Sequence, residues 1–145
     1  MISPLLYGGH EIRDTKLLLN RRRLLADRKL LGRWGEKRCQ RFLKRKGLKT
    51  LTRNFSCNAG EIDLIMVDTD RTIVFVEVRT RADETFGSAE SSITFAKKAK
   101  LLRTARYFLA THDIDDRPFR FDVVIIVLGP RGTPQVRYYK NAFVP

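Results

Sequence analysis

The sequence predicts an α/β fold in which a mixed β-sheet is flanked by helices, with the elements in the order αβββαββ. Three observations support this prediction. A long basic segment has apolar residues at helical spacing, two neighbouring segments are typical of a β-hairpin, and "FRFDVVIIVL" (119–128) is a nearly continuous apolar strand. Because such a strand needs cover on both faces, helices are expected on both sides of the sheet.

Two helices are predicted. The first lies within "TKLLLNRRRLLADRKLLGRWGEKRCQRFLKRKG" (15–47), after a lead-in of about twelve residues. A break is expected near Gly32, and Gly47 is the expected C-terminal glycine. The second helix is "TFAKKAKLLRTARYFLATH" (94–112), with Thr94 as its N-cap.

Five strands complete the prediction. "LKTLTRNFS" (48–56) precedes a hairpin with strands at 61–67 and 72–80 and with "DTDR" at its turn. The apolar strand 119–128 follows the second helix, and "VRYYKNAF" (136–143) ends the chain as a short strand.

Length and composition indicate one domain in a reducing compartment. The chain has 145 residues, of which 43% are hydrophobic, so it can form a core of ordinary size. No apolar stretch is long enough for a membrane helix, and no secretory signal is apparent. Two cysteines do not make a disulfide framework, so the protein is expected in the cytoplasm.

The net charge of +13 predicts a polyanionic partner. Residues 13–49 hold fifteen Lys or Arg against three acids, so nearly all of the excess lies there. Such a segment repels itself unless an anion binds it, which favours nucleic acid. A solvated basic helix is the simpler alternative, and a membrane surface is a weaker one because the segment has few aromatic residues.

Charged residues interrupt both hairpin strands. Glu61 and Asp63 lie in "GEIDLIMV" (60–67), and Glu77 and Arg79 lie in "VFVEVRTR" (74–81). A buried charge is costly unless it is paired or binds a metal. The residues therefore form either a structural ion-pair network or a functional site.

The hairpin register decides which carboxylates meet. A two-residue loop would place the carboxylates on opposite faces of the sheet. A three-residue loop, Thr69 to Arg71, would set Ile65 opposite Phe75, Asp63 opposite Glu77 and Glu61 opposite Arg79. Opposed side chains have Cβ atoms about 5 Å apart, a separation at which two carboxylates could share a divalent cation. The site hypothesis therefore requires Asp63 and Glu77 on one face.

A series of short motifs resembles a known family. The motifs are "GRWGE" (32–36), "RN" (53–54), "GEIDLI" (60–65), "VFVEVRTR" (74–81), "FG" (86–87), Lys97-Lys98, "RFDVV" (120–124) and "NAF" (141–143). In this order they resemble the YraN family, small and largely uncharacterised bacterial proteins with a restriction-endonuclease-like fold similar to archaeal Holliday-junction resolvases. The resemblance implies that residues 31–145 form that domain. Residues 1–30 would be a basic N-terminal extension, partly helical or disordered.

The resemblance also implies a PD-(D/E)xK site that uses Mg²⁺ or Mn²⁺. Asp63 and Glu77 match the two acids, and Glu36 matches an acid on the leading helix that can reach the metal. Glu61 and Asp122 are accessory candidates, although Asp122 could equally pair with Arg120. The basic residues expected to hold the phosphate backbone are Arg38, Arg41, Lys44, Arg45, Arg81, Lys97 and Lys98.

One position departs from the family pattern. The family typically has a lysine two residues after the second acid, where this chain has Arg79. Arginine cannot serve as a general base, but it can stabilise charge on a phosphate. Lys97 or Lys98 could supply the missing ammonium from the following helix.

Two main functions are therefore expected from the sequence. The first is a nucleic-acid-binding phosphodiesterase acting on branched or structured DNA. The alternative is a non-catalytic DNA- or RNA-binding module that has lost the catalytic lysine. In a weaker third interpretation, the protein is an RNA- or ribosome-associated basic protein whose acids only anchor arginines. A homodimer would suit a junction substrate, and the sequence leaves that question open.

Overall fold

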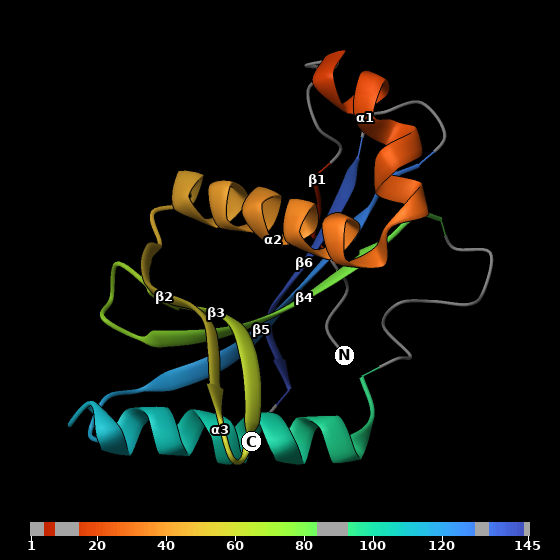
Figure 1. The fold of residues 1–145 in the computed structure, drawn as a ribbon. Helices are drawn as coiled ribbons and strands as arrows, with labels where there is room; N and C mark the ends of the chain where they lie inside the picture. The colour runs from red at the N-terminus through yellow and green to blue at the C-terminus, as the bar shows by residue number, and fades with distance from the viewer. Residues whose placement is uncertain (1–4, 8–14, 84–92, 130–133, 144–145) are drawn as a thin grey trace.

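The computed structural model describes residues 5–7, 15–83, 93–129 and 134–143, which form one mixed sheet between helices (Figure 1). The helices are α1 (Thr15–Ala26), α2 (Arg28–Arg45) and α3 (Phe95–Thr111). The strands are β1 (Leu5–Tyr7), β2 (Lys49–Cys57), β3 (Gly60–Val67), β4 (Ile73–Arg81), β5 (Phe119–Val127) and β6 (Gln135–Phe143). None of the helices in these ranges is long and apolar enough to span a membrane.

The strand order in the sheet is β1-β6-β5-β4-β3-β2. Strands β4 and β5 are parallel and are joined through α3, while the other neighbours are antiparallel. From α2 onward the elements follow the predicted order αβββαββ, and the α/β fold class is confirmed. Strand β1 and helix α1 precede this series, and β1 pairs with β6. The "FG" motif at 86–87 lies outside the described residues.

The leading basic segment is divided into two helices at Asp27, five residues before the expected break at Gly32. The Asp27 side chain accepts hydrogen bonds from the backbone N–H groups of Lys29 (3.0 Å) and Leu30 (3.2 Å). Asp27 is therefore the N-cap of α2. Glycine has no side-chain acceptor for such hydrogen bonds, so Gly32 could not begin a helix in this way. The predicted end is confirmed, because Gly47 has φ +96° and Leu48 N–H donates to Leu43 O (3.2 Å).

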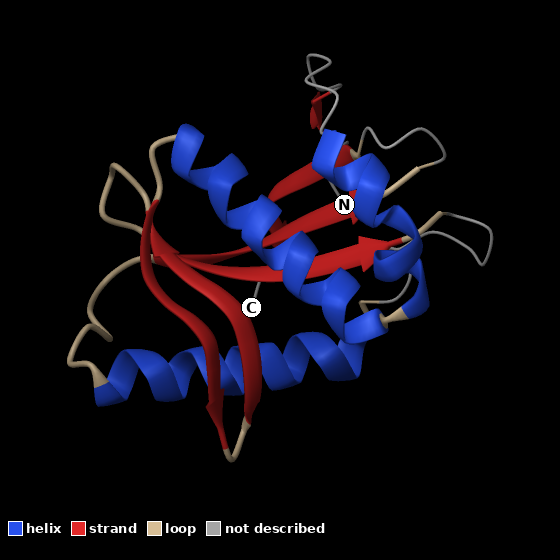
Figure 2. Ribbon diagram, turned by 45° about the horizontal axis from the view of Figure 1, so that its top comes forward, coloured by secondary structure: helices blue, strands red, loops and turns tan. Residues whose placement is uncertain are grey.

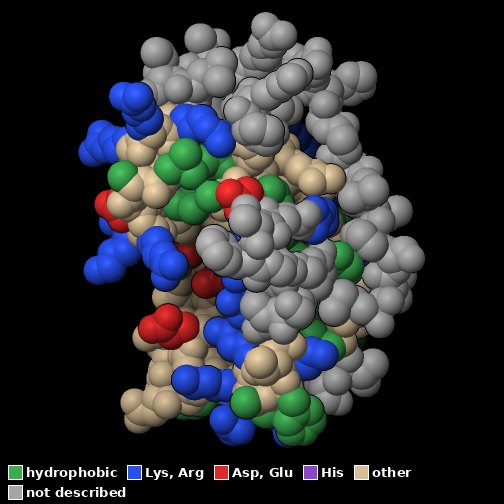
Figure 3. Space-filling view, turned by 90° about the vertical axis from the view of Figure 1, so that its right-hand side faces the viewer, with side chains coloured by type: hydrophobic (Ala, Val, Ile, Leu, Met, Phe, Trp, Pro, Cys, Tyr) green, Lys and Arg blue, Asp and Glu red, His purple; other side chains and the backbone are tan. Residues whose placement is uncertain are grey.

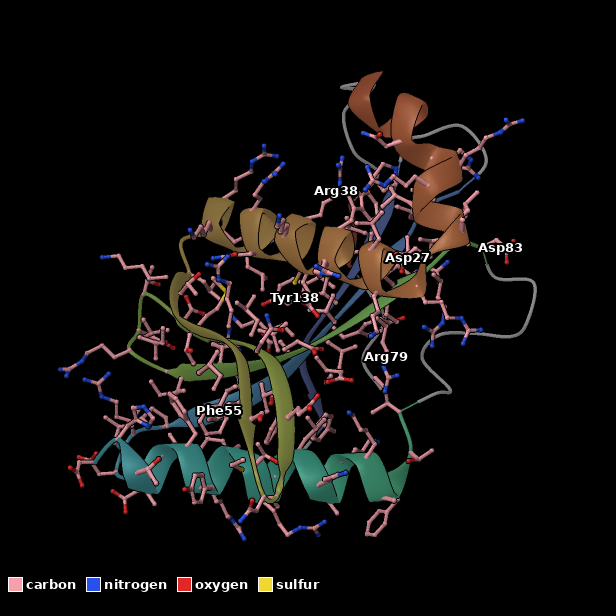
Figure 4. The ribbon with its side chains drawn as sticks, viewed as in Figure 1. Asp27, Arg38, Phe55, Arg79, Asp83 and Tyr138 are labelled. Atoms are coloured by element: carbon pink, nitrogen blue, oxygen red, sulfur yellow. The ribbon has the colours of Figure 1, made fainter. Side chains whose placement is uncertain are left out.

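Each face of the sheet has its own core, as the strand 119–128 predicted. On the α2 face, Cys39 and Leu43 are fully buried against β3, β4 and β5. On the α3 face, Phe75 of β4 meets Phe108 of α3 edge to face, with ring centroids 6.0 Å apart. Figure 4 shows Phe55 of β2 between the β2–β3 hairpin and α3, where its ring also meets that of Phe108, with centroids 5.1 Å apart. These two cores fix both helices relative to β4.

The β3–β4 loop has the three residues that the site hypothesis requires. Asp68 N–H donates to Thr72 O (2.9 Å), Arg71 has φ +71°, and Ile65 pairs with Phe75. The predicted register is thus confirmed near the turn. Pairing of β3 with β4 ends at Leu64 and Val76, and from there β3 continues with β2 alone. Figure 2 shows the β2–β3 hairpin bending away from the sheet and over α3.

Candidate active site

Asp63 and Glu77 lie at the fork where β3 separates from β4. They are the next residues after the last ladder pair, Leu64 and Val76. Beyond the fork, no strand among the described residues pairs with β4 on this side. The Asp63 carboxylate takes the place of a backbone acceptor, because Val78 N–H donates to Asp63 Oδ2 (2.9 Å). The Asp63 side chain is thereby fixed beside Glu77, whose side chain is 7% exposed. The fork creates room for two carboxylates inside a sheet.

Burial raises the pKa of both carboxyl groups, and the charge of Asp63 adds to the rise at Glu77. Burial raises the pKa of Glu77 to about 7, with a further contribution from the charge of Asp63. Burial also raises the pKa of Asp63, although the Val78 N–H, the Lys97 and Arg79 charges and a hydrogen bond with Glu77 oppose the rise. Pairs of titratable groups perturbed in this way are typical of functional sites.

Two cations contact Glu77 from different elements. Arg79 Nη2 lies 3.2 Å from Glu77 Oε1, and Lys97 Nζ, from the first turn of α3, lies 3.6 Å from the same oxygen. The Arg79 Nε is buried and has no hydrogen-bond partner within the described part of the chain. Figure 4 shows Arg79 between α2 and the start of α3. An arginine with a buried, unused donor beside an acid pair could bind a phosphate oxygen.

Glu36 approaches Asp63 from α2. Burial raises the pKa of Glu36, and the nearby charge of Asp63 raises it further. Helix α2 can come this close to β4 because residue 35 is glycine: a Cβ there would lie 1.9 Å from Thr80 Oγ1. The sheet face and the helix thus bring Glu36 and Asp63 within electrostatic reach of one another.

Asn54 has a place in the site that its sequence pattern did not predict. Its side chain makes a hydrogen bond with Glu36 that lowers the pKa of that carboxyl group. Asn54 also has φ +51°, a left-handed conformation that is strained for most residues and that clusters at functional sites. Its place in the "RN" motif was the available signal, but a strand pattern does not show backbone dihedrals.

The predicted phosphate-binding residues fall into two groups. Lys97 contacts Glu77 at the fork, and Arg81 is the last residue of β4, four residues beyond Glu77. Lys98 instead covers the Phe143 ring (5.5 Å), so of the two candidate lysines only Lys97 contacts Glu77. The others are on α2: Arg38 stacks over Trp34, while Arg41, Lys44 and Arg45 are exposed. By the helical rise, Arg45 is about 14 Å along the axis from Glu36.

Figure 3 looks onto the end of the molecule that carries the fork. Some acidic side chains lie set back from the surface there and others lie at the surface, with Lys and Arg side chains near them. Acidic and basic side chains therefore lie close together on this face of the molecule.

Two accessory candidates lie away from the acid pair. Glu61 pairs with Ser56 of β2, because β3 has separated from β4 at this point. The prediction that Glu61 lies opposite Arg79 is therefore wrong. Asp122 is fully buried on the α2 side of the sheet and accepts hydrogen bonds from Arg120 (3.0 Å) and Tyr138 (2.6 Å). This network joins β5 to β6, and Arg120 also binds Asp68 in the hairpin loop (2.9 Å). Asp122 is thus part of the framework.

The acid pair suits a magnesium-type ion. The described residues contain no group of three or more His, Cys, Asp or Glu positioned to hold one metal. Asp63 and Glu77 nevertheless provide two adjoining carboxylates whose repulsion a cation would relieve. Mg²⁺ commonly binds through one or two carboxylates and keeps several waters. The charge of Asp63 reaches Glu36 and raises the pKa of its carboxyl group, and the role of Glu36 as a third ligand stays a prediction.

The fold and the site define an α/β protein with an acid pair at a forked strand. A family model described as "Uncharacterised protein family UPF0102" matches residues 35–126, and the chain belongs to this family, as the YraN resemblance predicted. A UPF0102 protein of Nitrosomonas europaea is 49% identical over 102 residues, covering 70% of this chain and 83% of the relative. One from Pelotomaculum thermopropionicum is 41% identical over 121 residues, covering 82% of this chain and 100% of the relative.

A solved structure is also similar to the chain. The crystal structure of a repair endonuclease from Pyrococcus abyssi matches with a TM-score of 0.35 and 17% identity. The match covers 87% of this chain and 42% of the endonuclease chain.

Proposed function

We propose that the protein binds nucleic acid and hydrolyses phosphodiester bonds in branched or structured DNA with Mg²⁺ or Mn²⁺. The observation that carries the proposal is the Asp63–Glu77 pair at the fork, buried, electrostatically strained and contacted by Lys97 and Arg79. A purely structural network would pair each acid with a cation, whereas among the described residues both cations contact Glu77 and Asp63 forms no ion pair.

The chain's own groups have distinct tasks in this proposal. Asp63 and Glu77 would hold the cation, which when bound supplies Lewis-acid stabilisation of the phosphate and an activated water. The Arg79 guanidinium, with its unused Nε, offsets negative charge on the phosphate as it develops. Lys97, from α3, brings its ammonium group to the Glu77 carboxylate. It would thereby replace the lysine that the family typically has at position 79.

A cleavage assay tests the proposal. Wild-type protein and Glu77→Gln are compared on branched, duplex and single-stranded DNA with Mn²⁺, and Asp116→Asn removes an exposed acid elsewhere as the matched control. We expect the wild type and the control to cleave and Glu77→Gln to lose activity by orders of magnitude. Binding of Mn²⁺ is measured in parallel by calorimetry, with Asp63→Asn as the variant that should lose it. A wild type that binds no Mn²⁺ or Mg²⁺ at millimolar concentration would end the enzyme proposal.

The second candidate function is a non-catalytic binding module, which is favoured because Arg79 stands where the family typically has a lysine. Substitutions of Arg79 distinguish this module from the enzyme. In the enzyme, Arg79→Lys should keep or raise cleavage, because lysine is the residue that the resembled family uses. Arg79→Ala should lower the rate by about 10²–10³, the usual effect of removing one preorganised donor. In the binding module neither change produces cleavage, and Arg79→Ala weakens DNA binding only modestly.

A further inference from the structure

A hollow of about 420 Å³ lies between the tip of the β2–β3 hairpin and the first turns of α3, and Lys97 links it to the acid pair. Lys97 belongs to both places, because it lines the hollow and its Nζ lies 3.6 Å from Glu77 Oε1. A ligand in the hollow would therefore lie next to a phosphate held at the acid pair. Neither the sequence motifs nor the family match assigns a role to this space.

A glycine in the lining lets the hairpin tip approach α3 closely. Gly60, at the hairpin tip, has φ +152°, and a Cβ there would lie 2.9 Å from Thr104 Oγ1 and 3.1 Å from Lys100 Cγ. The hairpin backbone thus rests directly on α3, and Thr104 is fixed in turn by donating to Lys100 O (2.8 Å). This contact fixes one wall and orients the stem of Lys100 along it.

The lining favours an anion. It carries the ammonium groups of Lys97 and Lys100 against one carboxylate, that of Glu61. Lys100 forms no ion pair with any residue that the structure describes, so its charge is available to a ligand. The described lining contains no aromatic ring on which a base could stack. Recognition there would be of a phosphate and not of a base.

We propose that the hollow is a second phosphate subsite, which binds the nucleotide next to the bond cleaved at the acid pair. This inference rests on the proposed function and adds the path of the substrate strand. The strand runs from Glu77 past Lys97 towards Lys100, with the neighbouring phosphate between the two lysines. A volume of about 420 Å³ lies within the ~300–1,000 Å³ usual for small-ligand pockets, enough for a nucleotide. Since phosphate contacts carry no base information, the subsite should not discriminate between sequences.

Binding without divalent cation tests the subsite independently of cleavage. Lys100→Gln keeps most of the stem that packs on Gly60 and removes the charge, and Arg106→Gln, on an exposed part of α3, is the matched control. The probe is the fluorescently labelled DNA, branched, duplex or single-stranded, that wild type binds most tightly in EDTA, followed by anisotropy. We expect Lys100→Gln to weaken binding about five- to tenfold and to reduce the salt slope by about 0.7–0.9, the value for one neutralised phosphate. Arg106→Gln should stay within about twofold of wild type.

Cys57 provides a direct readout of occupancy. Its thiol lines the hollow, whereas Cys39 is fully buried and serves as an internal reference. Alkylation by iodoacetamide, followed by mass spectrometry, should slow several-fold at Cys57 when the labelled DNA is bound. The slowing should be weaker for Lys100→Gln at the same DNA concentration. Alkylation of Cys57 at the free rate in DNA-bound protein would overturn the subsite.

The outcomes separate this inference from the proposed function. A wild type that binds DNA, with Lys100→Gln binding equally well and Cys57 unprotected, removes the subsite and leaves the acid pair untouched. A wild type that binds no DNA removes both. Protection of Cys57 in a protein that proves unable to cleave would keep the subsite as part of a binding module.

Discussion

Glu77 shows what the fork does at the scale of a single residue. A carboxylate in a β-strand would ordinarily be exposed, yet Glu77 is buried beside a second carboxylate. The two cations that contact it do not bring its pKa back to the ordinary value, which is 4.5. A site of this kind costs folding free energy, and a bound cation would recover part of that cost.

The first prediction concerns stability and pH. Because the folded-state pKa of Glu77 is about 7 and its ordinary value 4.5, the folded protein holds a proton that the unfolded chain has released. The stabilising contribution of this proton is fully present below pH 4.5 and is lost as the pH rises through about 7. Urea unfolding in EDTA should therefore show wild type losing on the order of 2 kcal/mol between about pH 5 and 8.

Glu77→Gln is the matched variant for this measurement. The amide keeps the shape of the side chain and cannot ionise, so much of the pH slope should disappear, and the variant should be the more stable protein at the alkaline end of the range. Some slope should persist, since the pKa of Asp63 is raised as well. Identical slopes for both proteins would show that Glu77 ionises normally in the folded state.

At the scale of the element, the approach of α2 to β4 determines whether Glu36 can contribute to the site. Gly35 faces Thr80 with no space for a side chain, whereas Gly32, one turn earlier in the same helix, faces open space: a Cβ there would meet no atom within 4 Å. One glycine therefore permits a close contact and the other only lowers helix propensity. The pair offers an internal comparison.

The second prediction uses that pair. Gly35→Ala should destabilise the protein by about 1–3 kcal/mol, because Thr80 is short and branched and the helix must move. Gly32→Ala should stabilise it by about 0.5–1 kcal/mol, the usual gain in a helix interior. Thermal or urea unfolding measures both, and Thr80→Ala should recover part of the loss when combined with Gly35→Ala. Equal effects of the two alanines would contradict the close contact.

The β3–β4 hairpin shows which features of the strands and helices could be predicted from the sequence. Alternation from Ile65 to Phe75 and the turn residues were enough to predict the register near the loop. The fork was not predictable, because Asp63 continues the alternation while the strand is already leaving β4. The helix break at Asp27 and the left-handed Asn54 depended on capping and backbone geometry that apolar periodicity does not contain.

At the scale of the whole molecule, the exposed basic residues of α2 lie at a distance from the acid pair. The family model begins at residue 35 and ends at 126, so it includes the acid pair but leaves α1 and the first turns of α2 outside. Helix α1 is nevertheless attached to the sheet, with Leu24 packed on Leu128 and Arg21 donating to Gly129 O. The basic residues of both helices therefore form part of the folded protein and could bind a nucleic-acid backbone at a distance from the fork.

The last prediction tests this separation by charge reversal. Three exposed cations at the far end of α2 are changed to Glu together: Arg41, Lys44 and Arg45. DNA affinity should fall for all sequences about equally, and the salt slope on duplex DNA should fall by up to about 0.9 for each phosphate that is no longer neutralised. Because these residues are up to about 14 Å along the helix from Glu36, KM for cleavage should rise while kcat stays close to wild type.

The control reverses three exposed cations away from α2, which changes the net charge by the same amount: Arg103, Arg106 and Lys140. If α2 is the surface that meets the backbone, this control loses less affinity than the α2 variant. General electrostatic attraction, in contrast, depends on total charge, and it would weaken both variants alike. Equal losses would therefore contradict a backbone-binding role for α2, whereas a fall in kcat confined to the α2 variant would show that binding there is coupled to the acid pair.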